Sequence, residues 1–148
     1  MDTIIKSGTI VTVTDEYVAD IGIKDGKIVS IGADLGSDGT IIDAKGKLVL
    51  PGMIDAHVHL QLPFGGTVSV DSFETGTRAA AAGGVTTVID FAIQMTGQNL
   101  KEVIKARKAE ADGNVHVDYS LHGGIGNWNE QTRDQIKEII KEGISSFK

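Results

Sequence analysis

Two histidines stand two positions apart in the stretch PGMIDAHVHLQLPFGG, residues 51–66. Residues i and i+2 of a β-strand point to the same face, so His57 and His59 would project side by side while Val58 faces the other way. Two neutral imidazoles placed in this way can bind one divalent cation such as Zn²⁺. The spacing therefore predicts a metal site, and the alternative is a pair of ordinary polar residues at a strand end.

The residues around this pair favour the metal site. Asp55 stands two residues before His57, and Gly65 and Gly66 follow in a loop. Parallel α/β structures build their sites at the C-terminal ends of strands, which is where the pair would lie. Asp55 is expected either to orient one imidazole without binding the metal itself, or to fix the strand end. Because the chain has no cysteine, the metal ligands would have to be histidine, carboxylate or lysine-derived.

Composition excludes several classes of function. The net charge of -6 argues against nucleic acid as a partner, because nucleic-acid binders usually carry a basic face. The sequence has no apolar run approaching about 18 residues and no secretory signal at its start. The absence of cysteine excludes a disulfide framework. These features predict a cytoplasmic protein that acts on neither nucleic acid nor membrane.

The first third of the chain has a β-type hydrophobic pattern. Between Asp2 and Leu50, short apolar runs alternate with turn residues, and Asp25-Gly26 separates two of these runs. A two-residue Asp-Gly loop is typical of a β-hairpin, because its turn needs positive φ at both positions. Antiparallel β-structure is therefore predicted for this region.

Strands and helices alternate after Pro51. Strand-like runs recur every 30 residues or so, about the size of a βαβ unit. They begin near Met53, Val85, Val115 and Ser145. The helices between them are marked by a capping box at Asp71 and Glu74 with a stop at Gly83-Gly84, by Leu100, Val103, Ile104 and Ala111, and by Ile136, Ile139 and Ile140 before Gly143. Repeated strand-helix units predict a parallel sheet.

This part of the chain is short for a closed barrel. Three strand-helix units and a fourth strand are fewer than an eight-stranded barrel needs, since that fold takes about 250 residues. The sequence stops at Phe147-Lys148, inside the expected fourth strand. We therefore expect the natural protein to continue.

Several motifs resemble a known family. PGMIDAHVHL is similar to the first-strand metal motif of the amidohydrolase superfamily. LPFGGTVSVDSFETGTRAAAAGGVTTVIDF, VDYSLH and GISSFK resemble hydantoinases and dihydropyrimidinases in order and spacing, over essentially the whole chain. The resemblance implies an α/β fold, with residues 51–148 forming the first strands and helices of a (β/α)8 TIM-type barrel. Residues 1–50 would be the N-terminal part of a small β-sandwich domain.

The resemblance also implies a metal-dependent hydrolase. The reaction would be hydrolysis of the C–N bond of a cyclic amide, a dihydropyrimidine or a hydantoin, by a hydroxide bridging two divalent metal ions, expected to be zinc. His57 and His59 would bind one ion, and Lys148, carboxylated by carbon dioxide, would bridge both. The alternative for Lys148 is an ordinary solvated lysine. By the same resemblance the protein would be a homo-oligomer, a tetramer or a dimer.

Three further residues receive weaker assignments. Leu62 and Phe64 match the family's loop that touches the substituent on the substrate ring, or they anchor that loop. His122 ends the expected third strand and either supports the site from behind the ligands or is simply packed there. The family's general base and its other metal ligands lie beyond Lys148. No catalytic residue is therefore assigned within this chain, and the isolated 148 residues are expected to be inactive.

Three alternatives remain open. Allantoinases and dihydroorotases share the first motif but match the later motifs less well. A non-catalytic scaffold such as the collapsin response mediator proteins lacks the metal ligands, so the intact histidine pair and lysine count against it. A stand-alone β-rich binding module is opposed by the helices expected after Pro51.

Overall fold

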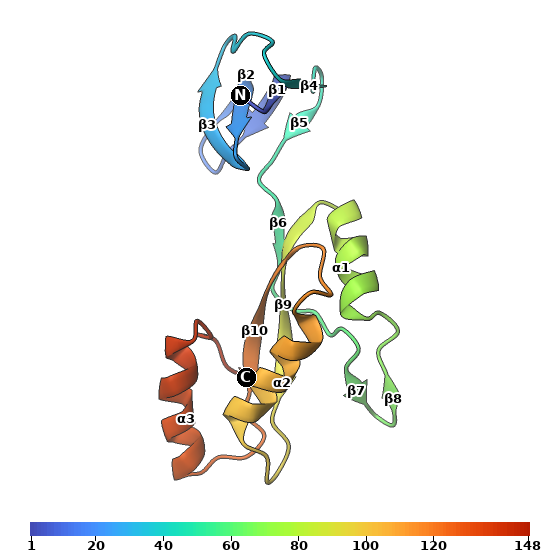
Figure 1. Cartoon of the computed structure of the whole chain (residues 1–148), viewed down its shortest axis with the longest axis vertical. Coiled ribbons are helices and arrows are strands. Elements are labelled where there is room, and N and C mark those ends of the chain that lie inside the picture. The colour runs from blue at the N-terminus through green and yellow to red at the C-terminus, as the bar shows by residue number, and fades with distance from the viewer. The chain divides into compact units, whose positions relative to one another are not determined.

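The chain folds as two units, Met1–Pro51 and Gly52–Lys148 (Figure 1). The computed structural model describes the backbone of residues 1–148 and every side chain except that of Phe64. Among the helices it describes, none is both long enough and apolar enough to cross a bilayer. Each unit has its own sheet, and the predicted α/β composition is confirmed.

The first unit is a five-stranded sheet in the order β3-β2-β1-β4, with β5 also paired to β1. Its strands are β1 (Thr3–Val11), β2 (Glu16–Lys24), β3 (Lys27–Gly32), β4 (Thr40–Asp43) and β5 (Leu48–Val49). Antiparallel pairing is confirmed for β1, β2 and β3 but wrong for β4 and β5, which run parallel to β1. The reason is that the chain crosses from β3 to the opposite edge of β1 before it re-enters the sheet.

The predicted hairpin joins β2 to β3. Asp25 and Gly26 have φ values of 50° and 71°, the left-handed conformation that a type I′ turn requires at both positions. Ile10, Ala19 and Ile21 form the small buried cluster of this sheet. Local turn chemistry and alternating apolar residues are therefore enough to explain the antiparallel strands β1, β2 and β3.

The second unit has a parallel sheet in the order β10-β9-β6, with helices between the strands (Figure 1). Its elements are β6 (Met53–Asp55), β7 (Pro63–Phe64), β8 (Thr67–Val68), α1 (Phe73–Ala82), β9 (Val85–Ile93), α2 (Leu100–Ala111), β10 (Asp118–Gly124) and α3 (Glu130–Lys141). All three predicted helices are present. The short strands β7 and β8 form an antiparallel hairpin between β6 and α1, which the sequence did not predict.

The cap of α1 differs from the prediction. The helix begins after Ser72, whose hydroxyl accepts the backbone N–H of Thr75, while the Thr75 hydroxyl accepts the backbone N–H of Ser72. The capping box is thus Ser72 and Thr75 instead of Asp71 and Glu74. Asp71 accepts a hydrogen bond from the Thr75 hydroxyl and lies one residue outside the cap. The end of the helix is at Gly83, as predicted.

Except for β9, which begins at Val85 as predicted, the strands of the parallel sheet are shorter than the sequence indicated. β6 ends at Asp55, and β10 begins at Asp118, three residues after the expected start. The expected fourth strand is a single parallel bridge between Gly123 and Phe147. That last segment is nevertheless held in place, because Ile144 is packed in the cluster of Leu100, Ile104, Leu121 and Ile139, which joins β10 to α2 and α3.

Candidate metal centre

The side chains singled out by the sequence converge on one aromatic ring. Phe91 lies near the C-terminal end of β9, the central strand of the parallel sheet, and is only 3% exposed. The ring centroids of His57, His59 and His122 lie 4.7, 4.8 and 4.8 Å from that of Phe91. The Lys148 Nζ lies over the same ring, 4.9 Å from its centroid. All three predicted ligands therefore meet at the carboxyl edge of the sheet.

The two histidines are adjacent, although not for the predicted reason. β6 ends before them, so the alternation of a strand does not set their direction. Their ring centroids are nevertheless 5.1 Å apart, with an interplanar angle of 81°. The backbone N–H of Val58 donates to the carbonyl of Ile89 at 3.2 Å and keeps this segment beside β9. Asp55 accepts the backbone N–H of His57 at 3.1 Å, a contact that fixes the backbone where the strand ends.

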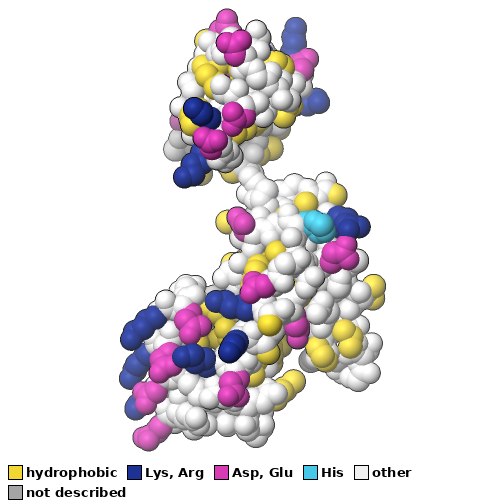
Figure 2. Space-filling view, viewed as in Figure 1, with side chains coloured by type: hydrophobic (Ala, Val, Ile, Leu, Met, Phe, Trp, Pro, Cys, Tyr) yellow, Lys and Arg dark blue, Asp and Glu magenta, His cyan; other side chains and the backbone are white. Residues whose placement is uncertain are grey.

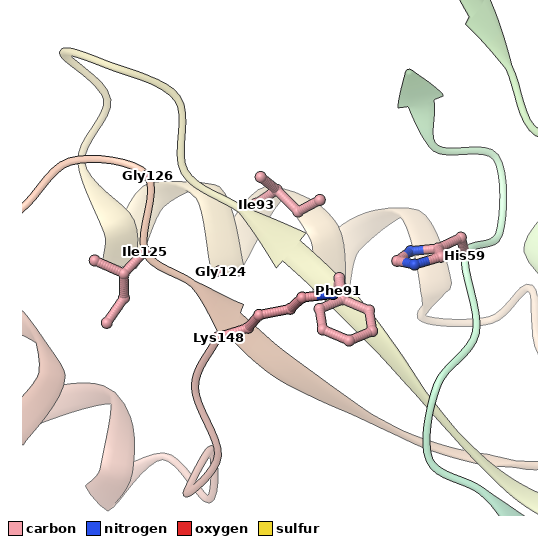
Figure 3. A pocket seen from close by; sticks show the side chains of 7 residues that line it. All are labelled: His59, Phe91, Ile93, Gly124, Ile125, Gly126 and Lys148. Carbon is pink, nitrogen blue, oxygen red and sulfur yellow. The ribbon is translucent and has the colours of Figure 1, made fainter. Parts of the chain in front are cut away.

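Lys148 is aligned by the last residues of β10 and the loop that follows. Its backbone N–H donates to the carbonyl of Gly123 at 3.0 Å, and its own carbonyl accepts the N–H of Ile125 at 2.8 Å. Figure 3 shows its side chain extended toward Phe91, with His59 on the far side of that ring. The amine is therefore presented to the same space as the imidazoles.

His122 links the segments that carry the predicted ligands. Its Nδ1 lies 2.6 Å from the Ser146 hydroxyl, and its Nε2 lies 2.9 Å from the Ala56 carbonyl oxygen. Ala56 directly precedes His57, and Ser146 is two residues before Lys148. Each ring nitrogen of His122 therefore has a hydrogen-bond partner within two residues of a predicted ligand. Sequence reasoning missed Ser146, since nothing in its local pattern points to a histidine far along the chain.

A buried ion pair holds the backbone just after His59. Arg107 of α2 donates from Nε to the Asp90 carboxylate at 2.7 Å and from Nη2 to the Leu60 carbonyl. Asp90 also accepts the Leu60 N–H at 3.3 Å. Burial raises the pKa of Asp90, and the Arg107 guanidinium opposes that rise. Both hydrogen-bonding groups of the Leu60 peptide backbone are thereby bound to one ion pair.

A cavity of about 640 Å³ opens beside the predicted ligands. Its lining includes His59, Leu62, Val70, Ile93 and Lys148. The backbone N–H of Leu62 donates to the Ser69 hydroxyl at 2.8 Å, which closes the base of the β7–β8 hairpin. Leu62 therefore lines the same cavity as His59 and Lys148. The Phe64 side chain, predicted to share this role, lies outside the part of the chain that the structure describes.

The donor set suits a divalent metal when Lys148 takes part. Imidazole nitrogens are ordinary zinc ligands, and His57 and His59 offer two of them close together. Among the described side chains, no group of three histidine, cysteine, aspartate or glutamate residues could hold a metal ion. Lys148 is the residue predicted to supply a further donor, although its amine carries no coordinating lone pair while it is protonated. A carbamate on that amine would supply anionic oxygen ligands.

Comparison with known proteins identifies the family. The family model described as "Amidohydrolase family" matches residues 48–147. The chain belongs to the amidohydrolase family. A D-hydantoinase of Geobacillus stearothermophilus is 48% identical, over 100% of this amidohydrolase chain and 32% of its own length. A dihydropyrimidinase of Dictyostelium discoideum is 45% identical, over 98% of this chain and 29% of its own length.

A solved structure supports the same relationship. A D-hydantoinase crystal structure superposes with a TM-score of 0.95 at 47% sequence identity, covering 99% of this amidohydrolase chain and 32% of the other. The predicted resemblance to hydantoinases and dihydropyrimidinases is thus confirmed. The chain spans about a third of the length of these relatives.

Proposed function

We propose that the intact protein hydrolyses the C–N bond of a cyclic amide, either a 5,6-dihydropyrimidine or a hydantoin. The observation that carries this proposal is the convergence of His57, His59 and Lys148 on Phe91, next to a cavity of about 640 Å³. Relatives that match the whole chain are named D-hydantoinase and dihydropyrimidinase. The inferred reaction class agrees with both the donor set and these names.

The proposal includes the architecture around the site. Residues 51–148 would be the first βα units of an eight-stranded barrel, and residues 1–50 the N-terminal part of a β-sandwich domain. The parallel order β10-β9-β6 and the parallel bridge from Gly123 to Phe147 support this arrangement, because successive parallel neighbours are how such a barrel grows. The candidate ligands then lie on the face where barrels of this type hold their active sites.

In the proposed site, His57 and His59 would hold one divalent metal ion, and Lys148 as a carbamate would contribute oxygen ligands to two. When bound, such ions lower the pKa of a water molecule and polarise a carbonyl oxygen. The carbamate forms when the deprotonated Lys148 amine bonds to the carbon of carbon dioxide and the second amine proton passes to solvent. His122 would keep the two ligand segments together through Ala56 and Ser146.

The substrate would enter beside the hairpin. Leu62 and Val70 make part of the cavity wall apolar, while His59 and Lys148 lie on the same cavity. The apolar wall suits the carbon substituents of the substrate ring. The part of the cavity that His59 and Lys148 line suits the amide group of that ring. Leu62 would therefore contact the ring substituent, as the family resemblance implied.

The test uses the intact protein with 5,6-dihydrouracil and hydantoin as substrates, following the ring-opened carbamoyl acid. We expect hydrolysis that is lost when a chelator removes the metal and is restored by zinc. His57→Ala and His59→Ala should lower the metal content. His116→Ala is the matched control, because this exposed histidine lies outside the site. The proposal would be contradicted if the metal-loaded protein hydrolysed neither ring. It would also be contradicted if protein carrying both His57→Ala and His59→Ala kept its full metal content.

A further inference from the structure

Phe91 lies between the three segments that carry the histidine pair, His122 and Lys148. It lies on the central strand β9, and its partner across the parallel pair of β9 and β10 is His122. Asp90, the preceding residue, is bound by Arg107 of helix α2. Since successive side chains of a strand point to opposite faces, the Phe91 ring points away from that helix. It therefore faces the space into which His57, His59 and Lys148 project.

The ring of Phe91 contacts side chains of the candidate site. Four groups from three separate segments lie within 4.9 Å of its centroid. These separations are typical of aromatic packing and of a cation over an aromatic face. Phe91 belongs to none of the three hydrophobic clusters found among the described residues.

The ring also lies where two small cavities meet. One cavity of about 300 Å³ is lined by His59, Phe91 and Lys148, among others (Figure 3). Another of about 300 Å³ is lined by His57, His122, and again Phe91 and Lys148. The ring is 3% exposed, whereas His57, His59 and Lys148 are exposed. The Phe91 ring thus forms a buried apolar surface beneath the exposed side chains of His57, His59 and Lys148.

We propose that Phe91 is a positioning residue that sets the relative placement of His57, His59 and Lys148 before metal binds. This inference rests on the proposed metal site but adds a residue that binds no metal itself. A rigid ring restricts the rotamers of the side chains packed against it, and among these side chains lysine has the most rotamer freedom to lose. The ring has no ligand atom, so it cannot compete for the metal. Removing it should leave all the donors present but poorly arranged.

The test compares two buried apolar residues in the intact protein. Phe91→Leu removes the ring beneath the ligands, and Ile139→Ala is the control for loss of buried apolar volume, because Ile139 is 0% exposed and lies on α3, which carries none of the candidate ligands. Zinc affinity is measured by competition with a chelator, cobalt coordination by the visible spectrum of the cobalt-loaded protein, and stability by thermal unfolding of the metal-free protein. Phe91→Tyr restores the ring and serves as the rescue.

We expect Phe91→Leu to weaken zinc binding by about tenfold or more, as changes behind metal ligands commonly do, and to alter the cobalt spectrum. Ile139→Ala should change stability alone, and Phe91→Tyr should recover most of the affinity. Unchanged zinc affinity and cobalt spectrum in Phe91→Leu would overturn this inference while leaving the proposed function intact. An equal loss of affinity in Ile139→Ala would overturn it as well, because the effect would then be general destabilisation. Wild-type protein that binds no zinc would overturn both proposals.

Discussion

The lysine at position 148 is the residue whose chemistry depends most on its neighbours. Its Nζ lies 4.9 Å from the centroid of the Phe91 ring, and His57 and His59 contact that same ring. In this setting a carbamate would place negative charge beside two imidazole ligands. An ordinary ammonium group would instead repel a bound cation. A group that substitutes for the Lys148 side chain would therefore have to be negatively charged in the first case and positively charged in the second.

Replacing Lys148 distinguishes the two forms. In the intact protein, Lys148→Ala should lose both bound metal and turnover, and Lys148→Arg should fail as well, because a guanidinium stays protonated and cannot take up carbon dioxide. A short carboxylic acid added to Lys148→Ala should restore part of the activity by supplying the missing anion. Metal content and ring-opening rate are the measurements.

Lys137→Ala is the control for this series, since Lys137 pairs with Asp134 on the exposed surface of α3. It should leave metal content and turnover unchanged. The carbamate is ruled out if metal-free protein regains full activity with zinc under strict exclusion of carbon dioxide and bicarbonate. In that case mass spectrometry should find no added carbon dioxide on Lys148.

At the scale of elements, helix α2 braces the segment that carries the histidines. Arg107 reaches from α2 to Asp90 on β9 and to the carbonyl of Leu60, one residue after His59. Both partners of the Arg107–Asp90 pair are almost fully buried, with side-chain exposures of 7% and 0%. Removing one partner of a buried pair leaves an uncompensated charge, which is far more costly than losing an exposed pair.

Arg107→Ala should therefore lower the free energy of unfolding by about 3 to 5 kcal/mol. Arg78→Ala is the matched control, because Arg78 also pairs with an acid, Glu74, but on an exposed helix face where the loss should be below about 1 kcal/mol. Denaturant unfolding of the intact protein measures both. Similar losses for the two variants would show that the Arg107–Asp90 pair does not stabilise the contact between α2 and the segment after His59.

At the scale of the whole chain, large apolar side chains are exposed on several strands. Charged side chains of both signs gather over α3 (Figure 2), and Lys101 of α2 pairs with Glu138 and Glu142 there. In contrast, large apolar side chains are exposed on the sheets. They include Ile28, Val29 and Ile31 of β3 and Met53 and Ile54 of β6, each between 49% and 66% exposed. Exposed apolar strands favour association with other surfaces.

The isolated 148-residue chain should therefore bind a hydrophobic dye and self-associate as its concentration rises, more than the intact protein does. Dye fluorescence and light scattering after gel filtration measure this. Ile54→Lys should reduce the association, and Ile140→Lys, which changes an exposed apolar residue on charged α3, should affect it less. A strictly monomeric chain that binds no dye would contradict the expectation.

Much of this fold follows from local sequence. The Asp25-Gly26 turn, the helices α2 and α3, and the parallel strand-helix order were predictable, because turn chemistry and hydrophobic periodicity act over a few residues. The motif around His57 and His59 was enough to suggest the family. The α1 cap was assigned one residue early, because Asp71 and Ser72 are both good N-cap residues and only the helix geometry chooses between them.

Tertiary structure alone decided how the site is assembled. β6 stops before the histidines, so their adjacency comes from backbone contact with β9 and packing on Phe91 instead of strand alternation. The partners of His122 and the joint between Arg107 and Leu60 connect residues that are far apart in sequence. No local pattern encodes such pairs, because the register of parallel strands and the packing of the helices bring them together. The sequence by itself determined which side chains could bind a metal, and the fold determined that they meet.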